Sequence, residues 1–444
     1  MSIRFRLPRP LGVLLLLAWL VAVASARTRA ESSVLPSRGQ AAWQDLQFGV
    51  LVRFGLATYL EADTGEGEES VTLFAPDQFD ALQWSRGARS AGARYLMVTV
   101  KGRDGFCLWP SRRTEYSVRA APWRDGQGDV LREVSAACRE SDLRLGLWFP
   151  LEDRHEPSAA NPAAYNEFLQ GQLAELLTDY GEVAELRLQA GESGSAPPLM
   201  AGVDLGGLLQ LARHLQPRMV VTGIGPDARS LDAGEVVLRE EEFSGQPVGS
   251  EAWWGRLFPG RDRVWRPVER LVNLRPSPFY RARENNRLLS VAQLTDDWLR
   301  SVGRNASLLL SVPAMPTGLL AEGDVRRLQE LGAAIRPWSM PDLPAVAGEG
   351  EELSLSLSPP REVEGMFVAE DLLHGERVKR FLLEVREPGG DGWRVVHEGR
   401  VLGHLQMVRF NPRQVEAVRL RVLESEGHPT IRRLAVVPVP QAPQ

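Results

Sequence analysis

The chain has 444 residues, of which 43% are hydrophobic and 25% are charged, and its formal net charge is −5 at pH 7. This length suffices for two domains with a sizeable core. The absence of a basic block argues against a nucleic-acid partner. Two cysteines without clustered histidines do not make a metal site, so we expect no metal and no other cofactor.

Residues 1–26 are predicted to be a secretory signal peptide. Arginines precede an apolar run at residues 11–24, and small residues at 24–26 supply a cleavage site. No later apolar stretch is long enough to span a membrane. We therefore expect a secreted or periplasmic protein. The alternative is an uncleaved anchor, for which the apolar run is short.

A polar linker is expected over residues 27–42, and the folded part begins at Trp43. Strand-like runs follow at residues 48–55, 95–100, 143–149, 184–188, 219–221 and 307–312. Helical patterns cover residues 78–91, 129–140, 162–180, 208–215 and 291–302. The sixth and seventh units are poorly defined between residues 235 and 275. Such alternation indicates a parallel sheet built from βα units, and it predicts a TIM-like (β/α)₈ barrel over residues 43–336.

The pattern changes after Gly332. Prolines at positions 337, 341 and 344 predict a linker over residues 337–352. Short strand-like runs separated by turns then continue to the end of the chain. We expect a C-terminal antiparallel β-sandwich over residues 353–440.

The strand at 95–100 ends in a polar turn at 101–105. The loop that follows carries four aromatic residues: Phe106, Trp109, Tyr116 and Trp123. Barrels of α/β type build their ligand sites on loops at such strand ends. The alternative is that the aromatic side chains pack the loop onto the domain.

The segment 101–138, KGRDGFCLWPSRRTEYSVRAAPWRDGQGDVLREVSAAC, resembles the matching segment of the α-L-fucosidases of glycoside hydrolase family 29. In that family the turn reads Lys-His-His-Asp-Gly-Phe, and both histidines reach the sugar. Here these positions are Gly102 and Arg103. The resemblance implies a carbohydrate partner and metal-free retaining hydrolysis of terminal α-L-fucose from glycans.

Two further expectations follow from the resemblance. Many bacterial members end in a discoidin-like module, which the runs HGERVKRFLLEV and AVRLRVLES resemble. This module either binds a glycan or braces the barrel, and we favour bracing. Export makes a disulfide possible. However, the family commonly has cysteine at the positions of both Cys107 and Cys138, so we expect two buried thiols.

A retaining glycosidase needs two carboxyl groups about 5 Å apart, one of them the nucleophile. The family's nucleophile is the Asp of Glu-Val-Trp-Phe-Asp-Gly at the end of the fourth strand. The corresponding run here is ELRLQA, which puts Gln189 at the nucleophile position. An amide cannot form the glycosyl-enzyme ester, so we expect an inactive or impaired member. The alternative is an active glycosidase that uses another carboxylate, such as Glu192, or a different sugar.

Two glutamates are candidates for the catalytic acid/base. Glu235 lies near GPDARSLDAGE, which resembles the family's GPD-x-RW-x-GNE. Glu269 lies in WRPVERLVNLRPSPFY, which resembles PAECDVSIRPGWFY and also keeps Arg275. Either glutamate can instead be an ordinary surface charge.

Replacements by arginine occur at several predicted strand ends. The family's His-Trp-Gly after the first strand is Arg53-Phe54-Gly55 here, and strand alternation puts Arg187 on the inward face with Gln189. We expect Arg53, Arg103 and Arg187 to line one pocket. Their charges should be paired with Glu185, Asp104 or Glu269, or with an anionic ligand. The predicted substrate-binding residues are Arg53, Phe54, Gly102, Arg103, Trp109 and Arg275.

Overall fold

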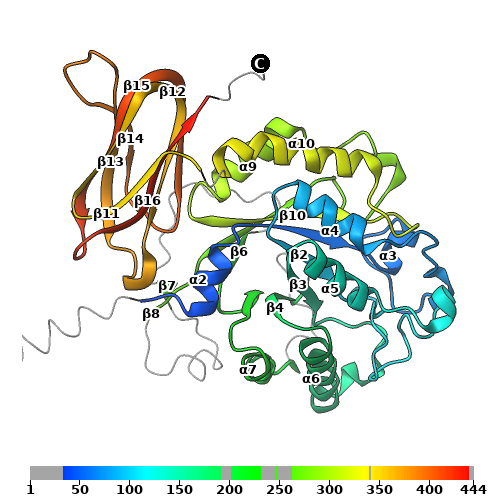
Figure 1. The fold of residues 1–444 in the computed structure, drawn as a ribbon. Coiled ribbons are helices and arrows are strands. Elements are labelled where there is room, and N and C mark those ends of the chain that lie inside the picture. Colours follow the sequence, from blue (N-terminus) through cyan, green and yellow to red (C-terminus); the bar gives the residue numbers. More distant parts are fainter. Residues whose placement is uncertain (1–33, 192–201, 232–245, 248–262, 340–341, 440–444) are drawn as a thin grey trace, which may run out of the picture.

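The computed structural model describes residues 34–191, 202–231, 246–247, 263–339 and 342–439 (Figure 1). The predicted signal peptide lies outside the described residues, as do Glu192 and Glu235. In the part of the chain that is described, no helix is long and apolar enough to cross a membrane.

Eight parallel strands form a nearly closed barrel in the order β5-β4-β3-β2-β1-β10-β9-β6, which confirms the predicted fold class. They are β1 Phe48–Arg53, β2 Tyr95–Thr99, β3 Arg144–Pro150, β4 Val183–Gln189, β5 Val220–Gly223, β6 Arg229–Leu231, β9 Val268–Asn273 and β10 Ala306–Pro313. At the gap between β5 and β6, the backbone N–H of Gly223 donates to the hydroxyl of Ser230 at 3.0 Å. This hydrogen bond links the two strands that the backbone ladder does not join.

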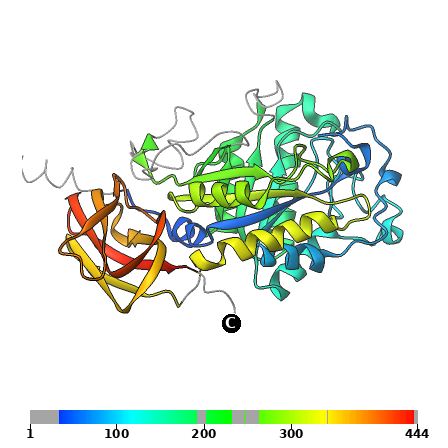
Figure 2. The same cartoon turned by 90° about the horizontal axis from the view of Figure 1, so that it is seen from above.

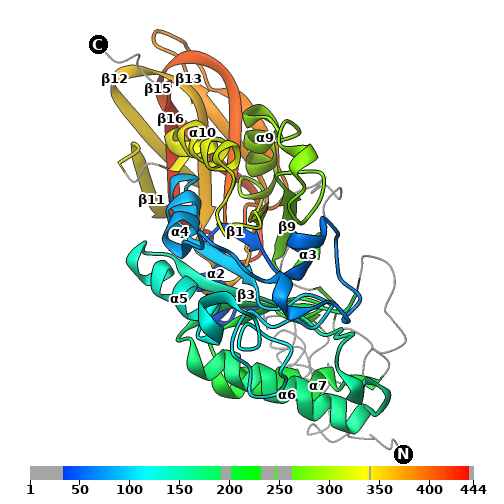
Figure 3. The same cartoon turned by 90° about the vertical axis from the view of Figure 1, so that its right-hand side faces the viewer.

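Helices surround the strands (Figures 1 and 3). They are α2 Arg38–Gln44, α3 Leu56–Leu60, α4 Ala81–Ser90, α5 Val130–Glu140, α6 Pro162–Asp179, α7 Leu205–Leu215, α9 Val291–Ser301 and α10 Glu322–Ser339. Short 3₁₀ turns occur at Val71–Leu73, Trp123–Gly126, Pro157–Ala160, Ala282–Glu284 and Leu372–His374. Side-chain N-caps fix where several helices begin: Asp80 accepts hydrogen bonds from the N–H groups of Leu82 and Gln83.

Side chains alternate between two cores along each barrel strand. Leu51, Met97 and Trp148 pack inside the barrel. Leu96 and Val98 point the other way, into the larger core between strands and helices. This alternation decides which strand residues can reach a pocket at the barrel mouth.

The second domain is a six-stranded antiparallel sheet in the order β11-β16-β12-β15-β13-β14, as expected for the predicted β-sandwich. Its strands are β11 Ala345–Glu349, β12 Glu352–Glu370, β13 Val378–Arg386, β14 Arg394–Gly399, β15 Gln406–Ser425 and β16 Thr430–Pro438. The pairing of β12 with β15 shifts register between Ser356 and Arg361. Such irregularities bend long strands, and this sheet encloses its own apolar core. A separate two-stranded sheet joins β7 Gln246–Pro247 to β8 Arg263–Val264.

The structure differs from the predicted linkers. Helix α2 starts inside the expected linker 27–42, where Ser37 and Gln40 form a capping box. Helix α10 continues through Pro337 to Ser339, because buried Trp338 anchors its last turn. Strand β11 also lies within the expected linker 337–352 and pairs with β16. Pro337 has no backbone N–H, yet the helix continues to Ser339, so this proline did not mark the domain boundary.

The sandwich packs against one end of the barrel (Figure 2). Its residues Phe367, Leu405 and Ala435 belong to the main barrel core. Asn305 exchanges backbone and side-chain hydrogen bonds with Leu405, of 3.1 and 2.8 Å. These contacts hold the sandwich against the barrel.

Candidate active site

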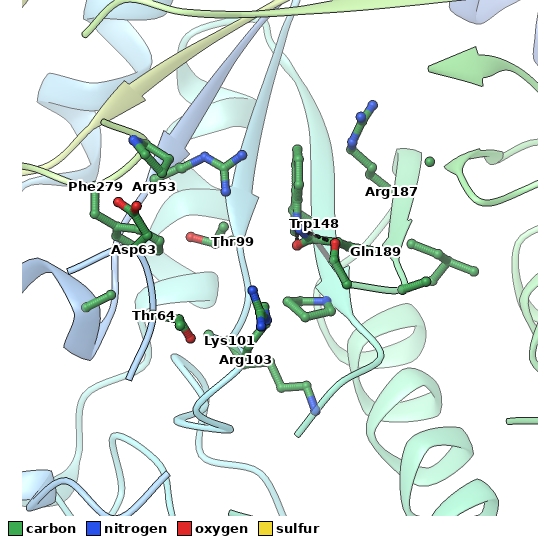
Figure 4. Close-up of a pocket in the computed structure, with 18 of the residues that line it drawn as sticks. Arg53, Asp63, Thr64, Thr99, Lys101, Arg103, Trp148, Arg187, Gln189 and Phe279 are labelled. Carbon is green, nitrogen blue, oxygen red and sulfur yellow. Dashed lines mark hydrogen bonds between the residues drawn. The ribbon is translucent and has the colours of Figure 1, made fainter. Parts of the chain in front are cut away.

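A pocket of about 610 Å³ opens at the carboxyl ends of the barrel strands (Figure 4). Arg53 comes from the end of β1, Thr99 from β2, Gln189 from β4 and Asn273 from β9. Parallel strands bring their carboxyl ends to one rim, which is where barrel enzymes place their sites.

Gln189 ends β4 beside Pro150 of β3, so the structure places it at the pocket mouth. The indole N–H of Trp148 donates to the side-chain amide oxygen of Gln189 at 2.8 Å. Its amide nitrogen donates to the carbonyl oxygen of Gly191 at 3.1 Å. An indole N–H can only donate, so the amide oxygen must face Trp148 and the NH₂ group must face the other way.

Trp148 also lies against two guanidinium groups. The guanidinium carbons of Arg53 and Arg187 are 4.3 and 4.6 Å from the centroid of the indole ring. Arg53 donates to the hydroxyl of Ser311 at 3.1 Å. Arg187 donates to Ser230 at 2.9 Å and forms a buried ion pair with Glu269.

Among the described lining residues, the other two cations also have acidic partners. Lys101 is completely buried and contacts Asp153 at 2.7 Å, and Arg103 contacts Glu152 at 2.7 Å. The three arginines therefore line one pocket, as predicted. Arg187 pairs with Glu269, one of the expected partners, whereas Arg103 pairs with Glu152, which was not among them.

Glu269 lies deeper, in the barrel interior. It is fully buried on β9. Inward-facing residues alternate along this strand, so Glu269 precedes Leu271 and then Asn273 on the same face. Glu269 is not among the described residues that line the pocket. Tyr95 donates to it at 3.1 Å. Burial and the adjacent Glu269 carboxyl, which hydrogen-bonds to Glu185, raise the pKa of Glu185 well above its usual range. The surroundings of Glu269 are those of an interior polar cluster, on the opposite side of Arg187 from the mouth.

The remaining predicted residues divide into two groups. Gly102 lines the pocket with Arg53 and Arg103. Phe54, Trp109 and Arg275 are buried outside the described pocket lining. Each has a packing role, since Phe54 contacts Phe74 and Trp84, Trp109 donates to Glu175 at 2.9 Å, and Arg275 binds Asp324 at 2.9 and 2.7 Å.

The aromatic loop after β2 packs onto the domain, since Phe106, Trp109, Tyr116 and Trp123 are all buried in the main core. Cys107 and Cys138 are free and buried, which confirms the expected thiols. Burial raises the pKa of Cys138 to about 12.

Sequence reasoning did not predict that Trp148 and Asp63 line the pocket, and it named Asp104 only as a possible partner of the arginines. Asp63 is paired with Arg281 at 2.7 Å. Burial raises the pKa of Asp104 to about 6. Among the described residues, its Oδ2 has no hydrogen-bond partner. Strand alternation could have identified Trp148, because it puts this residue on the same inward face as Pro150, which pairs with Gln189.

The described residues include no group of three or more histidine, cysteine or acidic side chains that could hold a metal ion. A barrel with a polar pocket at the carboxyl ends of its strands is a frequent enzyme scaffold and does not by itself specify a reaction. The family model for alpha-L-fucosidase matches residues 66–337. The chain therefore belongs to the α-L-fucosidase family.

Individual relatives agree. Alpha-L-fucosidase 1 of Arabidopsis thaliana is 30% identical, over 90% of this chain and 87% of that protein. Putative alpha-L-fucosidase 1 of Oryza sativa subsp. japonica is 37% identical, over 67% of this chain and 58% of that protein. The crystal structure of a putative alpha-L-fucosidase from Bacteroides ovatus has a TM-score of 0.81 and 30% identity, and the match covers 92% of this chain and 75% of that one.

Proposed function

We propose that this protein is an exported member of the α-L-fucosidase family that binds carbohydrate in the barrel pocket and has lost most or all of the family's retaining hydrolysis. The observation that carries the proposal is Gln189 at the carboxyl end of β4. The retaining mechanism needs a carboxylate there, because a carboxylate attacks the anomeric carbon and its charge stabilises the oxocarbenium-like transition state. A neutral amide does neither.

The surroundings of Gln189 support the same conclusion. Arg53 and Arg187 both lie against Trp148, the residue that holds the Gln189 amide. Positive charges so close to the anomeric centre raise the energy of a cationic transition state. The pocket retains the size and polarity of a ligand site, about 610 Å³ at a barrel mouth.

One observation favours the alternative of an active glycosidase with a different carboxylate. Asp104 lines the pocket, and burial raises its pKa to about 6, a value suited to a general acid near neutral pH. Turnover that disappears in Asp104→Asn but survives Gln189→Ala would support this alternative.

Carbohydrate binding is tested by calorimetric titration of the full chain with L-fucose and fucosylated oligosaccharides. Ala190→Trp places a large side chain in the pocket lining and should abolish binding. Ala163→Trp is the matched control on the exposed face of α6, and it should bind like the wild type. Binding that survives Ala190→Trp would place the sugar elsewhere, for example on the C-terminal domain.

A further inference from the structure

We infer that residues 61–70, the loop after α3, form a lid over the pocket, and that Arg154 is the latch that holds this lid closed. The lid forms one wall of the pocket, because Asp63 and Thr64 are among the lining residues. Figure 4 shows both of these side chains across the pocket from Gln189. The inference goes beyond carbohydrate binding, since it concerns how a ligand enters the pocket and leaves it.

Polar contacts attach the lid to the domain. Its sequence, EADTGEGEES, has five acidic residues and a single apolar side chain, Ala62. The hydrophobic clusters of the described residues include none of residues 61–70. At the start of the lid, Asp63 forms an ion pair with Arg281 at 2.7 Å. A segment with so few buried apolar contacts opens at a lower free energy than the core of the protein. The lid can therefore lift while the barrel stays folded.

Arg154 joins the lid to the loop after β3. Its Nη1 donates to the carbonyl oxygen of Gly65 at 3.0 Å and to the carboxylate of Glu66 at 2.9 Å. Beside it, the ring Nδ1 of His155 donates to the carbonyl oxygen of Gly67 at 2.6 Å. The side chains of Arg154 and Glu66 are 26% and 82% exposed, so salt screens their attraction.

Glu152 connects this latch to the pocket. One of its carboxylate oxygens accepts from Nε of Arg154 at 3.0 Å, and the other accepts from Nε of Arg103 at 2.7 Å. Arg103 lines the pocket. A ligand that moves the Arg103 guanidinium therefore acts on the carboxylate that orients Arg154, because the three side chains form one hydrogen-bonded network.

Gly67 allows the lid to close tightly. Its φ is 89°, in the left-handed region that favours glycine. A Cβ at this position would lie 2.8 Å from the peptide atoms that join Arg154 to His155. Any side chain here would therefore push the lid away from the loop after β3.

Asp104 makes the closed state costly. Its Oδ2 has no hydrogen-bond partner among the described residues. Burial and, to a smaller extent, the Glu69 carboxylate of the lid raise the pKa of Asp104 to about 6. Opening the lid takes Glu69 away from this carboxyl. The repulsion between Asp104 and Glu69 thus favours opening, and the contacts of Arg154 oppose it.

The test measures how fast a glutamate-specific protease cuts the lid of the full chain, since Glu66, Glu68 and Glu69 supply cleavage sites. At a low protease concentration the rate follows the population of the open form. Arg154→Gln should speed cleavage within the lid about five- to tenfold, and Arg154→Lys should have a smaller effect. Raising NaCl from about 50 to 500 mM should speed cleavage of the wild type more than that of Arg154→Gln. A synthetic peptide of residues 58–73 corrects for the effect of salt on the protease.

Gly67→Ala opens the lid in a second way, because the added Cβ meets the loop after β3 and no charge is removed. Its matched control is Gly350→Ala, between β11 and β12, where φ is 106° but the space is open. The control for charge is Arg144→Gln, which removes the exposed pair with Glu182 at the amino end of β3. Gly67→Ala should speed cleavage of the lid, and both controls should be cut like the wild type.

Three results would overturn the inference. If neither Arg154→Gln nor Gly67→Ala speeds cleavage of the lid, these contacts do not hold it. If cleavage rises equally in the lid and in the barrel, the variants unfold the domain instead of opening a lid. Saturating methyl α-L-fucoside should slow cleavage of the wild-type lid. A glycoside that binds without slowing cleavage would show that the lid does not close over the ligand. If no glycoside binds, the proposed carbohydrate binding fails, whereas cleavage of the free protein still tests the lid.

Discussion

Trp148 and Gln189 are joined by a 2.8 Å hydrogen bond from the indole N–H to the amide oxygen, between adjacent strands at the mouth of the barrel. The same indole ring lies against Arg53 and Arg187. One buried side chain thus orients both the amide at the nucleophile position and two cations beside it. Trp148 is therefore a positioning residue for the pocket.

Trp148→Phe keeps an aromatic ring but removes the N–H donor. We expect about three- to tenfold weaker sugar binding, because the Gln189 amide loses its fixed orientation. We also expect a stability loss of about 1–2 kcal/mol from the lost hydrogen bond. Calorimetry and urea unfolding measure the two effects. The matched control is Trp84→Phe, since the Trp84 N–H donates to Gly318 in the barrel's outer core. This control should lose comparable stability and bind sugar like the wild type. Equal binding losses in both variants would show that Trp148 does not position the pocket.

The buried ion pair between Arg187 and Glu269 should be important for stability. Glu269→Ala leaves a buried guanidinium without this partner, and breaking such a pair costs about 3–5 kcal/mol. Glu140→Ala breaks the exposed pair with Arg86 and should cost far less. Urea unfolding of both variants makes the comparison, and similar losses would show that the interior pair is dispensable.

Stability should fall as pH rises because of Glu185. Its pKa is raised in the folded protein above the ordinary value of 4.5. Above about pH 4.5 the unfolded chain therefore loses this proton while the folded chain keeps it. The free energy of unfolding then decreases with pH until the folded carboxyl also ionises. Glu185→Gln, which is neutral throughout, should flatten this slope when unfolding is measured from pH 5 to 8. An unchanged pH dependence of the free energy of unfolding in Glu185→Gln would show that Glu185 does not cause it.

Cys107 and Cys138 should not react with a thiol reagent in the native protein. Both are buried and free, and burial raises the pKa of both thiols. Titration with a disulfide reagent should label neither thiol before denaturation and both afterwards. Absence of labelling after denaturation would instead indicate a disulfide.

The barrel was predictable because buried parallel strands alternate with amphipathic helices at regular spacing. Helix α2 was missed because it has only 7 residues and lies in a polar stretch. The last turn of helix α10 was missed because Pro337 suggested a linker, whereas the Trp338 ring lies against Gly365 of the sandwich. Helix propensity alone cannot predict this tertiary contact.

The candidate site was predictable where strand ends determine it. Arg53, Arg187 and Gln189 converge because parallel strands share a rim and alternate residues share a face. The resemblance alone predicted Phe54 as a substrate-binding residue. Because Phe54 follows Arg53, its side chain points to the opposite face, away from the pocket. The packing of Arg275 against Asp324 depends on contacts between distant segments, which no local pattern reveals.

Restoring the nucleophile should recover little activity by itself. Gln189→Asp supplies a carboxylate, but Arg53 and Arg187 remain nearby and both sugar-contacting histidines of the family are absent. Gly102→His is not a simple addition, because a Cβ at position 102 would collide with Oδ2 of Asp104. A combined Arg53→His, Gly102→His, Arg103→His, Gln189→Asp variant should exceed the single change only if Asp104 moves aside. Full recovery by Gln189→Asp alone would contradict this view.

The most direct measurement is the turnover of aryl α-L-fucosides and other aryl glycosides by the wild type and by Gln189→Ala. We expect no detectable hydrolysis of the fucoside by either protein, because loss of a catalytic nucleophile costs on the order of a millionfold where it has been measured in a protease. Robust wild-type hydrolysis of the fucoside that survives Gln189→Ala would contradict the account and show that another carboxylate performs the reaction.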